Sequence, residues 1–66
     1  MFTINSAKFS TFATATACAV KHAQQRGECK IRARSGALLA DFVRNDDGTV
    51  SIFATDYGRP LVEALA

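Results

Sequence analysis

Cys18 and His22 are the pair of side chains whose types and spacing could support covalent chemistry. They lie four residues apart in the sequence, so a helix would place the thiol beside the imidazole. A thiolate next to an imidazole is the minimum arrangement for nucleophilic catalysis, and the same two groups could contribute to a metal site. The sequence positions no acid to orient the histidine, and two ligands do not complete a zinc site. It therefore predicts no catalytic residue, no metal site and no cofactor.

Three acidic residues, Asp46, Asp47 and Asp56, form a second group that could bind an ion, in this case calcium. They lack the alternate spacing of oxygen ligands that a calcium loop requires. Residues 45–48 predict a tight hairpin turn instead, because Asn and Asp side chains bond to their own backbone and Gly accepts a positive φ.

Residues 28–34 alternate between small apolar and basic side chains. An extended backbone turns alternate residues to opposite faces, so one face would be apolar and the other would carry three cations. The apolar set is Cys29, Ile31 and Ala33, and the basic set is Lys30, Arg32 and Arg34. The segment is therefore predicted to be a half-buried strand with a basic outer surface.

The elements that would position this strand follow from periodicity and turn residues. We expect a strand at 2–5, a helix at 6–26, strands at 28–34, 37–44 and 49–55, and a short helix that begins at Pro60. Ser6 and Gly27 would cap the long helix. Its apolar stripe would consist of Phe9, Phe12, Ala13, Thr16, Val20 and Ala23. The last helix would pack on the core through Leu61, Val62 and Leu65.

These elements predict a small α+β fold with the order β-α-β-β-β and a short C-terminal helix. Residues 1–66 would form a single domain in which one antiparallel sheet packs on one long helix. A domain of 66 residues buries a small core, so a protein partner or a homodimer is expected. The order helix, three strands, short helix resembles the double-stranded-RNA-binding domain. Residues 58–63 depart from that family, because they contain one arginine where the family has a lysine-rich helix start.

The outer face of the predicted sheet is the main candidate for binding. If the strand at 37–44 points its even-numbered residues toward the helix, Leu39 and Val43 join Phe53 in an apolar cluster on the opposite face. Three large apolar side chains on neighbouring strands, bordered by cations, indicate a protein-binding surface. Its predicted residues are Lys30, Arg32, Arg34, Leu39, Val43 and Phe53. A second possible contact surface is the charge-poor back of the helix, at Ala7, Thr11, Thr14, Cys18 and Gln25.

Charge offers an alternative function. The net charge is +2, but cations predominate in residues 1–34 and acids in residues 35–66. A basic sheet face could therefore bind a nucleic acid. The alternative contacts are Lys21, Arg26, Lys30, Arg32, Arg34 and Arg44. Phe53 is the one ring on this face available for stacking on bases, so the sequence favours a protein partner over a nucleic acid.

The compartment follows from the cysteines and the hydropathy pattern. Two cysteines are too few for a secreted disulfide framework, and no segment has the length of a membrane span. We therefore expect a cytoplasmic protein with no membrane partner. The sequence predicts a non-enzymatic binding protein that acts by protein–protein contact. Short, motif-free chains of this kind are often encoded by phages and mobile elements as inhibitors of host defence machinery, so an anti-CRISPR-like role is our expectation.

Overall fold

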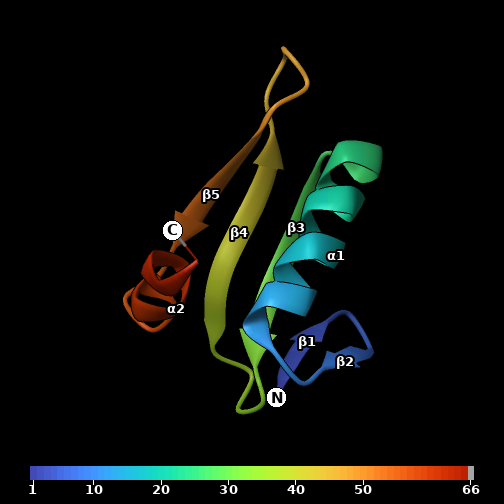
Figure 1. The fold of residues 1–66 in the computed structure, drawn as a ribbon. Coiled ribbons are helices and arrows are strands. Elements are labelled where there is room, and N and C mark those ends of the chain that lie inside the picture. Colours follow the sequence, from blue (N-terminus) through green and yellow to red (C-terminus); the bar gives the residue numbers. More distant parts are fainter. Residues whose placement is uncertain (66) are drawn as a thin grey trace.

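Five strands and two helices make up the computed structural model, which describes residues 1–65. The strands are β1 (Phe2–Ile4), β2 (Ala7–Phe9), β3 (Glu28–Ala33), β4 (Leu38–Arg44) and β5 (Val50–Ala54), and the helices are α1 (Phe12–Arg26) and α2 (Arg59–Ala64). The strands form one antiparallel sheet in the order β2-β1-β3-β4-β5. α1 lies across one face of this sheet, and α2 lies near the C-terminal end of β5 (Figure 1). The predicted small α+β fold is confirmed.

The N-terminal part of the predicted helix is wrong, because residues 7–9 form a strand. Asn5 adopts a positive φ of 54°, which folds β2 back on β1 with Ile4 opposite Ala7. Asn tolerates this left-handed conformation better than most residues. The helix begins at Phe12 and is capped by Thr11, whose Oγ1 accepts a hydrogen bond of 3.2 Å from the Thr14 amide. The chain thereby gains a two-stranded edge that the periodicity of the sequence does not show.

The buried stripe of α1 also differs from the prediction. It consists of Phe12, Ala15, Ala19 and Ala23, whereas Ala13 is exposed. The three buried alanines are fully covered, since a ridge of small side chains lets the helix approach the sheet closely. This rotation brings Cys18, predicted on the back of the helix, to a half-buried position against the core.

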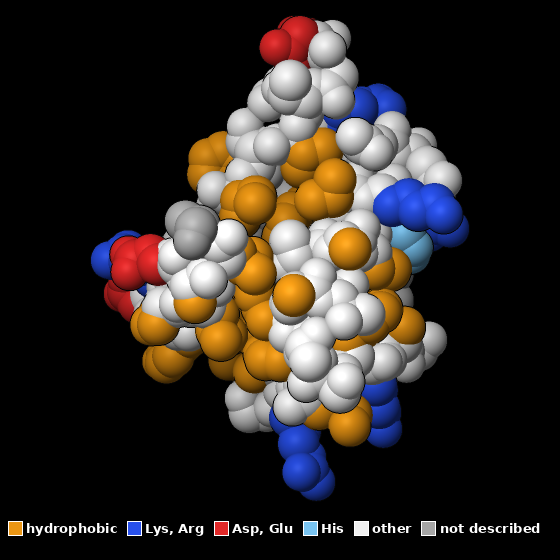
Figure 2. All heavy atoms as spheres, viewed as in Figure 1, with side chains coloured by type: hydrophobic (Ala, Val, Ile, Leu, Met, Phe, Trp, Pro, Cys, Tyr) orange, Lys and Arg blue, Asp and Glu red, His pale blue; other side chains and the backbone are white. Residues whose placement is uncertain are grey.

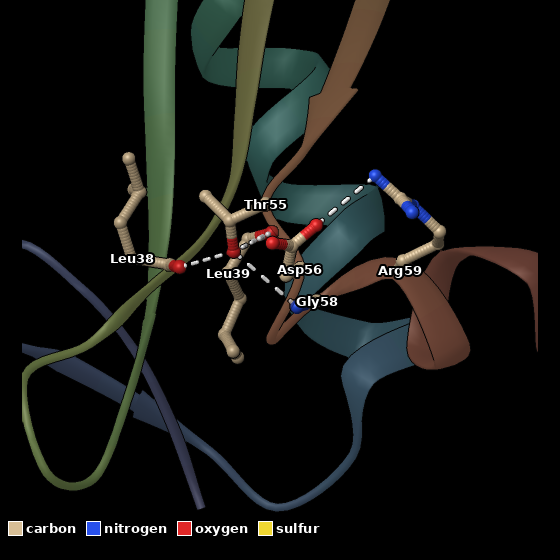
Figure 3. Close-up of polar contacts among 6 residues, drawn as sticks. All are labelled: Leu38, Leu39, Thr55, Asp56, Gly58 and Arg59. Carbon is tan, nitrogen blue, oxygen red and sulfur yellow. Dashed lines mark hydrogen bonds and ion pairs between the residues drawn. The ribbon is translucent and has the colours of Figure 1, made fainter.

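A β-bulge changes the orientation of one predicted binding residue, Leu39. Ile31 pairs with Ala40 but Arg32 pairs with Leu38, so Leu39 is an extra residue between them. Leu38 consequently shares the outer face with Arg32, whereas Leu39 turns into the core and is 4% exposed. Figure 3 shows the two leucine side chains pointing in opposite directions. The predicted position of Leu39 on the outer face is therefore wrong.

Residues that follow β5 hold this bulge in place (Figure 3). The Thr55 amide donates to the Leu39 carbonyl at 3.0 Å, and Thr55 Oγ1 donates to the Leu38 carbonyl at 2.6 Å. Gly58 is buried against the same backbone, where an added Cβ would lie 1.9 Å from the Leu39 carbonyl oxygen. From this anchor, α2 packs Leu61 and Val62 against the core, whereas Leu65 is 42% exposed.

Candidate binding surface

The outer face of the sheet, opposite α1, carries different kinds of side chain on its two halves. Cross-strand partners share a face, so the register places Lys8, Thr3, Arg32 and Leu38 in one row. The next row contains Lys30, Asp41 and Phe53, and a third contains Glu28, Val43 and Ser51. Cations therefore occupy the β2-β1-β3 half, whereas Leu38, Val43 and Phe53 occupy the β4-β5 half.

Lys30 is neutralised by two carboxylates and is not a free cation. Its Nζ lies 2.9 Å from Glu28 Oε2 and 3.7 Å from Asp41 Oδ2. The hydrogen bond to Lys30 lowers the pKa of Glu28, and the same bond raises the pKa of Lys30. Partial burial raises the pKa of Asp41, with a further contribution from the Glu28 carboxyl group. The predicted basic strand is therefore interrupted by a compact group of ionic partners at its centre.

Arg32 and Arg34 lie near a third cation, Lys8, which the sequence prediction did not include in the binding surface. Lys8 and Arg34 line a recess of about 350 Å³ together with Met1 and Thr3, and Arg32 lies beside Thr3 in the same row as Lys8. Within residues 1–65, no carboxylate lies within ion-pair distance of Lys8, Arg32 or Arg34. Basic side chains protrude at this end of the molecule in Figure 2. We call Lys8, Arg32 and Arg34 the basic end; Lys8 was missed because its segment was predicted to be helical.

The apolar part of the outer face depends mainly on Phe53. Its side chain is 60% exposed, and it stands opposite Asp41 on β4. Val43 and Leu38 are half-buried on the same face of β4, where Leu38 takes the place predicted for Leu39. We call Leu38, Val43 and Phe53 the apolar patch. The sequence prediction was right for the faces of Val43 and Phe53, and the bulge accounts for its error at Leu39.

The other predicted nucleic-acid contacts are not brought to this face. Lys21 and Arg26 belong to α1, on the opposite side of the sheet. Arg44 Nη1 donates a hydrogen bond of 2.8 Å to the Gln24 carbonyl near the C-terminal end of α1. The six cations predicted as one set therefore lie in separate places.

Cys18 and His22 do lie together, with 3.7 Å between Cys18 Sγ and His22 Nε2. The neighbouring thiol of Cys29 is buried, and burial raises its pKa, which disfavours the reactive thiolate. Both cysteines are free, and within residues 1–65 no group of three His, Cys, Asp or Glu side chains is placed to hold a metal ion. Among residues 1–65, no hydrogen bond joins a carboxylate to Cys18 or His22.

Neither α1 nor α2 is long and apolar enough to cross a membrane. No family model, no curated protein and no solved structure matches this chain.

Proposed function

We propose that this chain is a non-enzymatic binding protein that docks on another protein through its apolar patch. The observation that carries the proposal is the 60% exposure of Phe53 in the middle of a strand, beside Val43 and Leu38. Full burial of such a side chain stabilises an association by about 1.5–3 kcal/mol. A few large side chains, aromatic ones among them, dominate the binding energy of most protein interfaces when they are buried at the centre.

The finer form of the proposal concerns the partner. We infer that the partner is a nucleic-acid-guided defence complex of a host cell and that the two proteins meet in the cytoplasm. The chain would inhibit this complex as phage-encoded anti-CRISPR proteins do. Support comes from the small size of the fold and from two free cysteines. A protein that acts only by covering a surface inhibits in proportion to its amount. The dose curve should therefore end at a fixed ratio of inhibitor to complex.

Phe53→Ser tests the apolar patch. Binding to purified CRISPR effector complexes is measured by calorimetry for the wild type and the variant. We expect the variant to lose affinity about 30-fold or more, the range of a central interface residue. The matched control is Tyr57→Ser, which removes a ring that is 76% exposed but lies in the turn after β5. Equal affinity of the wild type and Phe53→Ser would overturn the patch, and no inhibition by the wild type would overturn the proposed partner.

The basic end supports a second candidate function, contact with a phosphate backbone. Two cations that line one recess, Lys8 and Arg34, with Arg32 opposite Thr3 beside it, would attract an anionic polymer. Binding to a fluorescent oligonucleotide should weaken steeply between low and moderate salt. Lys8→Gln or Arg34→Gln should reduce that salt slope by about 1, whereas Lys21→Gln on α1 should leave it unchanged. A salt-independent affinity would exclude this candidate.

A further inference from the structure

The free edge of β5 has a regular pattern of unpaired backbone groups. At the two ends of β5, the Thr55 amide donates to the Leu39 carbonyl and the Thr49 carbonyl accepts from the Asn45 amide, so both residues bond to the β4 side of the hairpin. Alternate residues of an antiparallel strand point their N–H and C=O groups to opposite sides. Ser51 and Phe53 therefore bond to β4, whereas Val50, Ile52 and Ala54 direct their backbone groups outward. β5 is the last strand of the sheet, so the described chain provides no strand to pair with these groups.

This edge also lacks the usual protection against pairing. Edge strands are commonly guarded by lysine, proline, a bulge or short length. β5 has five residues, none charged and none proline, and its pairing with β4 is regular throughout. The two most exposed side chains on it are apolar and lie on opposite faces, Ile52 at 41% and Phe53 at 60% exposure.

We propose that β5 pairs with β5 of a second copy of this chain, antiparallel, with Ile52 at the two-fold axis. In this register Val50 of one copy lies opposite Ala54 of the other, and Ile52 lies opposite Ile52. The three residues with outward backbone groups are centred on Ile52, so two identical edges satisfy one another completely. The sheet then continues across the axis.

The side chains on both faces fit this occupant. On the inner face, Val50 and Ala54 are half-buried and Ile52 is 41% exposed, and Figure 2 shows hydrophobic atoms gathered between α1 and this edge. A two-fold axis perpendicular to the sheet keeps the inner faces of both copies on the same side. The Val50, Ile52 and Ala54 side chains of the two copies then lie next to one another. On the outer face, Phe53 would lie opposite Ser51 of the second copy. Like charges do not meet along the paired strands, because Val50–Ala54 contains none.

Ile52→Pro tests the pairing without disturbing β4, because the Ile52 amide points away from it. The mass of the wild type in solution, followed by sedimentation over a range of concentrations, should reach twice the 7.1 kDa of one chain. Loss of the two amide donors at the axis should raise the dimer midpoint, the concentration at which half of the chains are dimeric, about 30-fold. Ile52→Lys, which places two cations at the axis, should shift it in the same direction. Ala7→Lys adds the same charge to the opposite edge, on β2, and should leave the midpoint unchanged.

Amide hydrogen exchange locates the interface and covers the case in which a variant fails to fold. At high concentration the amides of Val50, Ile52 and Ala54 should become protected, and on dilution they should exchange rapidly. Those of Ser51 and Phe53 should stay protected at both concentrations. A single-chain mass throughout, or a dimer with unprotected even-numbered amides, would overturn the proposal. Neither result depends on the apolar patch binding a foreign protein, since only the chain itself is present.

Discussion

The two edges of this sheet are built differently. β2 has three residues, carries Lys8 at its centre and follows a tight turn at Asn5. β5 has five residues, no charge and an exposed apolar side chain on each face. Edge strands are templates for association unless something blocks them. By this criterion the β2 edge is protected against pairing and the β5 edge is not.

The difference extends to how each edge is fixed to the fold. β1 pairs with β3 through only two residue pairs. Apolar contacts add to the attachment of the β1-β2 hairpin, such as the edge-to-face pair of Phe2 and Phe12, whose ring centroids are 5.5 Å apart. β5 pairs with β4 along its whole length, and its C-terminal end is fixed by Thr55 and Gly58. The unprotected edge is therefore also the firmly anchored one.

Gly58→Ala should destabilise the β5 edge more than any other single substitution proposed for it, because it breaks this anchor. The new methyl group would meet the Leu39 carbonyl oxygen at 1.9 Å, and the backbone must move to avoid it. We expect a loss of about 3 kcal/mol in the free energy of unfolding, the upper range for overpacking. Urea denaturation measures this loss.

Gly36→Ala is the control for that change. Gly36 has a positive φ of 93° but nothing within 4 Å of an added Cβ. Only backbone strain should appear, at about 1 kcal/mol. Equal losses at the two glycines would show that close packing against the bulge does not stabilise β5.

Sequence periodicity was sufficient for the sheet strands after the helix. Alternation in residues 28–34 and the turn at 45–48 predicted β3, β4 and β5 because each strand has a buried and an exposed face. It failed at residues 7–9, where three residues are too few to show alternation and a helical pattern continues through them. It also misplaced the helix stripe, since a run of alanine and threonine gives almost no contrast between faces.

The faces on which the candidate residues lie were predictable where the register was regular. Phe53 and Val43 were assigned to the outer face from alternation alone, and the register agrees. A bulge adds one residue and reverses the faces on one side of it, so Leu39 could not be assigned without its partner strand. Lys8 joined the basic end only through the pairing of β1 with β3, a contact between distant residues that no local pattern shows.

Lys8→Thr separates two explanations of why the β2 edge is protected. If short length protects it, removal of the charge should leave the sedimentation curve within about twofold of wild type, as for an ordinary surface change. We expect this result, because a three-residue strand offers few outward backbone groups. Additional, concentration-dependent association of Lys8→Thr would show that the lysine is the guard.

The smallest expected effect concerns the turn that leads into β5 and its dependence on pH. The Asp47 carboxylate accepts hydrogen bonds from the Thr49 amide at 3.0 Å and from Thr49 Oγ1 at 2.6 Å. These bonds lower the pKa of Asp47. A carboxylate with a lowered pKa stabilises the fold fully above its unfolded pKa, and this contribution is lost as the pH falls through the folded value.

Urea midpoints measured below pH 5 should therefore fall less steeply for Asp47→Asn than for wild type. Asp46→Asn removes an equal charge from the same turn but keeps both hydrogen bonds, so it should retain the wild-type slope. If the two variants changed the slope equally, net charge rather than this turn would govern the acid sensitivity of the β5 edge.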